Sequence, residues 1–163
     1  MPIRETLLKV AHRHPALRVT VLAGLRQAAT PADFASLKAA LHTAIGVADD
    51  LEGNFILVRD LLARGEARRL GRVSSMGVGT VTQTPERVTA PVRGTTDTYD
   101  VRITLAPHRG HHCTCPDWER NGRKVGPCKH VLALGLAWRE QYLEPELEQM
   151  KEHLQRMLMP YGG

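Results

Sequence analysis

Aromatic side chains are scarce in this sequence. Tryptophan, tyrosine and phenylalanine make up 4% of the 163 residues, although hydrophobic residues reach 42% in all. The chain can therefore bury a core, and that core has to consist mainly of aliphatic side chains and alanine. With 24% charged residues, this composition excludes a disordered tail, and the length fits one ordinary domain or two small ones.

Cysteine and long apolar runs are also rare. Three cysteines are too few, and odd in number, for a disulfide framework, so metal binding or burial in a reducing compartment is favoured. The most apolar stretch, residues 131–138, is far shorter than the roughly 18 residues that a membrane-spanning helix needs. No apolar signal segment opens the sequence. We therefore expect a cytoplasmic protein with no membrane partner.

Positive charge is concentrated in the middle of the chain. The formal net charge is +5. Residues 61–130 contain 12 basic and 6 acidic side chains, whereas the two flanking segments together have a net charge of −1. Such an uneven distribution indicates a binding face for a polyanion more directly than the total charge does.

Up to about Arg72, the spacing of apolar residues predicts four short helices that form a small bundle. Residues 30–33, Thr-Pro-Ala-Asp, are a helix start signal, and Gly46 is the predicted end of that helix. Asp49 or Asp50 is predicted to cap the next one. The four apolar stripes are Ile3/Leu7/Leu8/Ala11, Val21/Leu22/Leu25/Ala29, Phe34/Leu37/Leu41/Ile45 and Phe55/Val58/Leu61/Leu62.

From residue 74 onward the apolar period falls to two, which predicts strands. The strands are expected over residues 78–82, 88–92 and 99–105, in an antiparallel meander. After the cysteines, a helix is predicted over residues 131–141. Pro145 then fits the first turn of a last helix.

The three cysteines lie close together in the sequence, at positions 113, 115 and 128, and a histidine follows at position 130. In an extended segment the side chains at i and i+2 project to the same face, so the first two cysteines can bind one metal from a strand end. Cys128 then has to lie just before or at the first turn of a helix, with His130 inside that turn. Three thiolates and one imidazole form the closed tetrahedral set typical of structural zinc. We therefore predict one structural Zn²⁺ bound by Cys113, Cys115, Cys128 and His130.

Several alternatives to this reading of the motif remain open. His111 shares the face of Cys113, so it could replace a ligand or lie beside the site. The thiols could also be buried without a metal. A catalytic zinc would need an open coordination position, and the His-x-Glu of zinc deaminases is lacking. Trp118 could stack on a base or cover the zinc core, whereas Trp138 is predicted to lie in the core.

The pattern Cys-x-Cys…Cys-x-His resembles the SWIM-type zinc finger. Its flanks are similar as well: Tyr-Asp-Val at 99–101 leads a strand into Cys-Thr-Cys-Pro-Asp, and Pro-Cys-Lys-His precedes an Ala/Leu-rich helix. The resemblance covers residues 78–140 and leaves the N-terminal helices unmatched. It implies a β-β-α zinc fold that binds nucleic acid or another protein, with roles in repair, recombination or transcription.

The apolar pattern and this resemblance together predict an α+β fold. Residues 1–73 are expected to form a small helical bundle. Residues 74–142 should form the SWIM-type zinc-finger domain, with its three-stranded antiparallel meander and β-β-α finger. Residues 143–163 should add a C-terminal helix.

Basic side chains gather around the predicted finger, and a donor-rich loop at 120–124 is expected to contact phosphate. The alternative is a solvated basic loop that balances the negative charge of a zinc–thiolate centre. At helical spacing, Arg64, Arg68, Arg69 and Arg72 are interpreted as the exposed face of a helix. The candidate nucleic-acid contacts are Arg102, Arg109, Trp118, Arg120, Arg123, Lys124 and Lys129.

Taken together, these patterns predict a nucleic-acid-binding protein. DNA is the favoured partner, bound through its backbone with weak sequence selectivity. The alternative is a protein-interaction adaptor with a structural zinc, in which the finger or the Leu147/Met150/Leu154/Met157 stripe docks a partner helix. No nucleophile–base pair, phosphate-binding loop or carboxylate pair stands out, so we expect neither enzymatic activity nor a small-molecule substrate.

Overall fold

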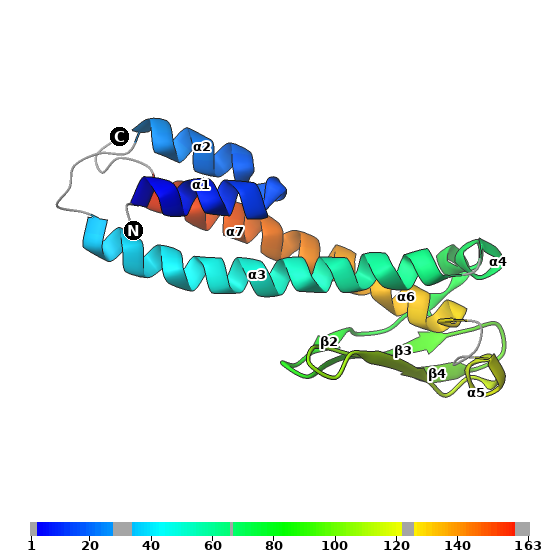
Figure 1. Cartoon of the computed structure of the whole chain (residues 1–163). Coiled ribbons are helices and arrows are strands. Elements are labelled where there is room, and N and C mark those ends of the chain that lie inside the picture. The colour runs from blue at the N-terminus through cyan, green and yellow to red at the C-terminus, as the bar shows by residue number, and fades with distance from the viewer. Residues whose placement is uncertain (1–2, 28–33, 66, 122–125, 159–163) are drawn as a thin grey trace. The chain divides into compact units, whose positions relative to one another are not determined.

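The computed structural model describes residues 3–27, 34–65, 67–121 and 126–158 (Figure 1). By its internal contacts the chain divides into two compact units. Residues 1–53 and 145–163 form the first, here called the helical unit, and residues 54–144 form the second, the finger unit. The domain boundaries expected after residues 73 and 142 stay predictions. No helix in the described ranges is long and apolar enough to cross a membrane.

The helical unit is built from amphipathic helices around an aliphatic core. It contains α1 (Ile3–Arg13), the 3-10 turn η1 (Pro15–Leu17), α2 (Arg18–Gln27), the first part of α3 (Phe34–Arg64) and most of α7 (Glu144–Leu158). Met150 and Leu154 of α7 are buried in this core, so part of the stripe predicted to dock a partner helix is occupied within the chain itself. The buried side chains are Leu7, Val10, Ala11, Leu17, Val21, Ala44, Ala48, Met150 and Leu154.

Gly46 does not end a helix, and this prediction was wrong. The helix α3 runs without a break through Gly46. A glycine inside a helix costs only about 1 kcal/mol relative to alanine, and the buried stripe of Ala44, Ala48 and Leu51 continues across it. Asp49, predicted as a possible cap, instead forms an ion pair with Arg13 at 3.1 Å from within the helix, and its carboxylate lies 2.8 Å from His14 Nε2.

Two leucines of the predicted apolar stripes are partly exposed. Leu8 and Leu22 were placed on buried stripes, but they are 46% and 38% exposed, because Val10 and Leu17 fill the core in addition to Leu7 and Val21. The start signal at residues 30–33 lies outside the described residues.

The finger unit contains an antiparallel sheet with the strand order β1-β3-β4-β5, and β2 also pairs with β3. Before the sheet come the short helix α4 (Ala67–Leu70) and the turn η3 (Val73–Ser75). The strands are β1 (Gly77–Val78), β2 (Thr82–Gln83), β3 (Arg87–Arg93), β4 (Thr98–Thr104) and β5 (Gly110–Cys113). The predicted antiparallel meander is therefore present, with β5 as an additional strand.

The strand predicted over residues 78–82 is split into β1 and β2, and Pro91 explains the interruption. Proline has no N–H for the ladder. Gly79 lies opposite it and donates its own N–H to the Pro91 carbonyl at 2.8 Å. A Cβ at Gly79 would lie 2.6 Å from Pro91 Cγ, so this close approach of the two strands requires glycine.

The helix α6 (Lys129–Trp138) packs against one face of the sheet (Figure 1). Val88, Ala90 and Val92 of β3 are buried, while Arg87, Pro91 and Arg93, which alternate with them, are exposed, so the sheet has an inner and an outer face. Trp138 is fully buried, as predicted, and its indole N–H donates to Gln83 at 2.9 Å. The chain continues through the π-helical turn η4 (Arg139–Leu143) into α7, where Pro145 lies in the first turn as predicted.

Candidate metal centre

Cys113, Cys115, Cys128 and His130 meet in the finger unit, and all four side chains are buried. Cys113 ends β5, and Cys115 immediately precedes the short helix α5 (Pro116–Asn121). Cys128 is the N-cap residue of α6, and His130 lies in its first turn. This is the placement that the spacing predicts for Cys128 and His130.

The geometry of these four side chains fits one zinc ion. One ligand atom from each residue lies within 4.8 Å of all the others, and Cys128 Sγ is 3.9 Å from His130 Nδ1. In a tetrahedron with metal–sulfur bonds of about 2.3 Å, neighbouring ligand atoms are about 3.8 Å apart. A Cys₃His set with all four positions filled by protein is a closed, structural site. The four residues would therefore hold one structural Zn²⁺, and they are the predicted ligands.

The sulfur atoms interact strongly with one another. Hydrogen bonding from Cys113 and Cys128 lowers the pKa of Cys115 below the ordinary thiol range. The hydrogen bonds of Cys113 to Cys115 and Cys128, together with burial, raise the pKa of Cys113. The backbone N–H of Trp118 also donates to Cys115 Sγ at 3.3 Å. These interactions prepare a thiolate at the N-terminus of α5, and a bound cation would displace the shared protons.

The imidazole of His130 is oriented by two neighbours. Its ring lies 4.7 Å from the ring of Tyr99, centroid to centroid. Its Nε2 atom faces Gly94, where a Cβ would lie only 3.0 Å away. With Nε2 on that side, Nδ1 faces Cys128 and is the nitrogen available to the metal. Gly94 and Tyr99 thus position a ligand without binding the ion themselves.

Arg69 ties the metal centre to α4, and its predicted exposed position was wrong. Its side chain is only 11% exposed. It donates to Asp117 of α5 at 3.0 Å and to the carbonyls of Gly126 and Pro127 at 3.4 and 3.3 Å. The planar guanidinium therefore contacts two segments at once: the one that follows Cys115 and the one that precedes Cys128. Arg64, Arg68 and Arg72 are exposed, as predicted.

Gly126 has a positive φ of 96°, which an L side chain rarely adopts. A Cβ there would also lie 2.8 Å from the carbonyl oxygen of Arg64. Glycine therefore allows the chain to turn into Cys128 while it passes close to the end of α3.

His111 does not belong to the ligand cluster, although it was predicted as an alternative ligand. Burial, with Arg64 and His112 nearby, lowers the pKa of His111, so its ring is neutral near pH 7. Its Nδ1 accepts a hydrogen bond from the indole N–H of Trp118 at 3.2 Å. The Trp118 ring also packs against His112 with centroids 4.4 Å apart. Trp118 is thus fixed by both histidines and remains half-buried.

A groove of about 840 Å³, here called the basic groove, lies between the end of α3 and β5 in the finger unit. Among the predicted nucleic-acid contacts, it brings together Arg102, Arg109 and Trp118. Arg64, interpreted from the sequence as a plain surface residue, also lines it. The polar and aromatic side chains of the lining are Asp60, Arg64, Arg102, Arg109, His111, His112 and Trp118.

The remaining predicted contacts are placed differently. Arg120 was predicted to lie in a loop, but this prediction was wrong, because Arg120 is an exposed residue of the helix α5. Pro116 at the start of α5, with acidic residues in the first turn, is the helix signal that the sequence analysis missed. Lys129 is half-buried at the start of α6. Arg123 and Lys124 lie outside the described residues.

Comparisons with known proteins agree with this geometry. Residues 108–138 match the SWIM zinc finger family, a span that contains all four ligands together with β5, α5 and α6. No curated protein and no solved structure matches the chain. The matched segment and the buried Cys₃His cluster together show that the chain contains a SWIM zinc-finger region at residues 108–138.

Proposed function

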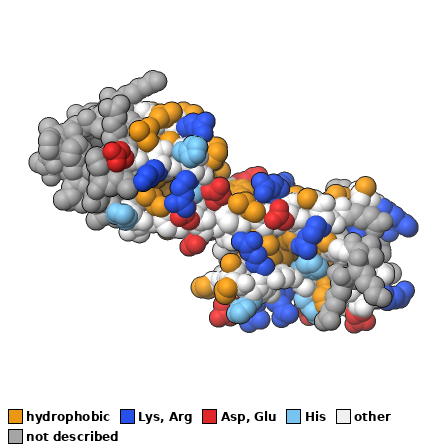
Figure 2. Space-filling view, viewed as in Figure 1, with side chains coloured by type: hydrophobic (Ala, Val, Ile, Leu, Met, Phe, Trp, Pro, Cys, Tyr) orange, Lys and Arg blue, Asp and Glu red, His pale blue; other side chains and the backbone are white. Residues whose placement is uncertain are grey.

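We propose that this protein binds nucleic acid, with DNA as the favoured partner, through contacts of its finger unit with the phosphate backbone. The observation that carries the proposal is the basic groove, whose lining contains three arginines and a single aspartate. The space-filling view shows many Lys, Arg and His side chains over the finger unit, with acidic side chains interspersed (Figure 2). We also propose that the protein acts as a binding module in repair, recombination or transcription and has no enzymatic activity.

The charges of the groove are available to a ligand. Within the described ranges, Arg102 and Arg109 form no ion pair with a carboxylate, and both are exposed. The carboxylate of Asp60, at the groove wall, lies 3.8 Å from Arg59. Three thiolates and Zn²⁺ would leave about one negative charge at the metal centre, which is fewer than the positive charges around it. Phosphate contacts by such arginines position a protein on nucleic acid without reading the sequence.

Protein interaction is the second candidate function, and it has a separate observation in its favour. Val19 on α2 is 81% exposed, and Leu22 on the same helix and Leu8 on α1 are partly exposed as well. These side chains belong to the helical unit, whereas the residues that carry the first proposal belong to the finger unit. The two functions are therefore testable separately.

Replacing Arg102 and Arg109 together by alanine should weaken DNA binding and reduce its salt dependence. Each lost phosphate contact reduces the magnitude of the slope of log K against log[salt] by about 0.9 for a duplex and about 0.7 for a single strand. The magnitude of the slope should therefore fall in the double variant by about 1.8 for a duplex and about 1.4 for a single strand. Fluorescence anisotropy with labelled oligonucleotides at several salt concentrations measures it.

Arg156→Ala is the matched control, because it removes one exposed arginine from the helical unit. It should leave the slope unchanged. A double variant at positions 102 and 109 with wild-type affinity and slope would contradict the phosphate-binding role of the groove and shift the assignment to protein interaction.

A further inference from the structure

The outer face of the sheet has a row of polar side chains that crosses four strands. Strand register places Thr82 opposite Thr89, Thr89 opposite Arg102, and Arg102 opposite His112. Neighbouring strands are about 4.8 Å apart, so the row extends over about 14 Å. It offers hydroxyl, guanidinium and imidazole groups, and these are the donors that bind phosphate and sugar oxygens.

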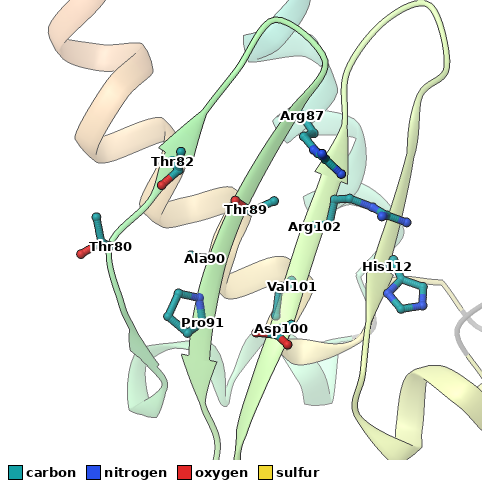
Figure 3. Close-up of a pocket in the computed structure, with 10 residues that line it drawn as sticks. All are labelled: Thr80, Thr82, Arg87, Thr89, Ala90, Pro91, Asp100, Val101, Arg102 and His112. Atoms are coloured by element: carbon teal, nitrogen blue, oxygen red, sulfur yellow. The ribbon is translucent and has the colours of Figure 1, made fainter.

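A shallow hollow of about 370 Å³ lies over this row (Figure 3). Arg102 and His112 line both this hollow and the basic groove, so the two depressions meet at these side chains. Figure 3 shows the Arg102 side chain extending from β4 toward β5, beside His112. Arg87 on β3 lies on the same face. A continuous path thus leads from the outer face into the groove.

An aromatic pair stands where the two depressions meet. The rings of His112 and Trp118 pack at 4.4 Å with a tilt of 55°, and the hydrogen bond to His111 fixes the indole. Trp118 lines the basic groove and is only half-buried. A ring that is held in place and partly exposed is a surface on which a nucleobase can stack at a small cost in entropy.

We propose that this path binds single-stranded nucleic acid, with phosphates at Arg87 and Arg102 and a base stacked on the His112–Trp118 pair. In a duplex the faces of the bases are covered by their neighbours, whereas a single strand presents them to an aromatic side chain. Asp100 also lies on the outer face and repels phosphate, so the strand runs over the Arg87 end of β3 and β4. This inference rests on the proposed function, because it specifies the nucleic acid that the same basic groove binds.

Three probes of equal length test the inference: oligothymidylate, an abasic strand with the same phosphates, and a duplex. We expect oligothymidylate to bind most tightly and to quench tryptophan fluorescence. The chain has two tryptophans, and Trp138 is fully buried, so the quenching has to come from Trp118. The Trp118→Phe variant should lose the quenching and keep most of the affinity.

Trp118→Ala should lower the affinity for oligothymidylate about 5- to 150-fold, as expected for one stacked base, and leave abasic binding nearly unchanged. His112→Ala should act in the same direction. Zinc content is measured for each variant. If Trp118→Ala loses its metal, the test rests on the fluorescence quenching of the wild type and on the affinity of Trp118→Phe. Phenylalanine keeps a ring on which a base can stack, so this variant should still bind oligothymidylate.

The outcomes separate the two proposals. Equal affinity for oligothymidylate and the abasic strand, without quenching, would overturn the stacking site and leave phosphate binding intact. Tighter binding of the duplex would overturn the single-strand preference alone. Absence of binding to all three probes would overturn the proposed function itself.

Discussion

We expect Cys128→Ser to release the metal and open the finger while the helical unit stays folded. Cys128 joins the two halves of the site, because it is both a ligand and the N-cap residue of α6. Zinc binding contributes about 10–16 kcal/mol in zinc-finger peptides, which is comparable to the total stability of about 5–15 kcal/mol for a whole domain. Loss of a thiolate ligand therefore removes a large part of what orders residues 110–121 and 126–130.

The opening should be local, for reasons that lie in the packing. Cys113 pairs with Val101 of β4, whereas α5 contacts other segments through the Arg69–Asp117 and Trp118–His111 hydrogen bonds and follows the ligand Cys115. The rest of α6 packs its own apolar side chains against β3 and β4. The helical unit has a separate core around Leu7 and Leu154, with no residue in the site.

Hydrogen exchange followed by mass spectrometry distinguishes these regions. Protection should fall in residues 110–121 and 126–131 and remain in α1 and η1. A chelator should produce the same pattern in the wild type, and added zinc should reverse it. Cys128→His is the matched control, since it leaves a Cys₂His₂ set that also binds structural zinc. Uniform loss of protection along the chain would show instead that both units unfold together.

The ligand set was predictable from the sequence because its geometry is local. Cys113 ends a strand and Cys115 lies two residues beyond it, while Cys128 and His130 are two residues apart at a helix start, so each pair can be placed from local spacing. The alternation of β3 and β4 is likewise a local pattern, and it was found. Trp138 was placed correctly because large aromatic residues on an apolar helix are usually buried.

Features that depend on distant segments were not predictable in this way. Helical spacing assigns Arg69 to a surface, but its partners are Asp117, Gly126 and Pro127, 48 to 58 residues further along the chain. The continuity of α3 through Gly46 depends on Ala44 and Ala48, whose burial is a tertiary property. In each case packing overrides the local preference of the chain.

Arg69→Met should lower the affinity for zinc about 10- to 100-fold, although Arg69 is not one of the four ligands. The methionine keeps the apolar stem and removes the guanidinium, so Asp117 and the two carbonyls before Cys128 lose their shared donor. Groups that orient metal ligands typically contribute affinity of this size. Asp117 is more than a third exposed, so water partly replaces the lost partner, and the main effect falls on the position of the ligands.

Arg68→Met is the matched control for this prediction, because it removes the same group from an exposed position on the same short helix, α4. It should bind zinc like the wild type. Arg69→Lys should give an intermediate affinity, since lysine keeps the charge but cannot present a planar fork to the carboxylate and the carbonyls together. Competition with a chromophoric chelator measures the zinc affinity of all three variants.

If Arg69→Met and Arg68→Met bind zinc equally well, Arg69 only packs beside the finger, and the residues that orient Cys115 and Cys128 lie within the finger itself. If only the Arg69 variants weaken, the end of α3 and α4 belong to the metal centre as a functional part, although they precede the matched finger in the sequence by about 40 residues.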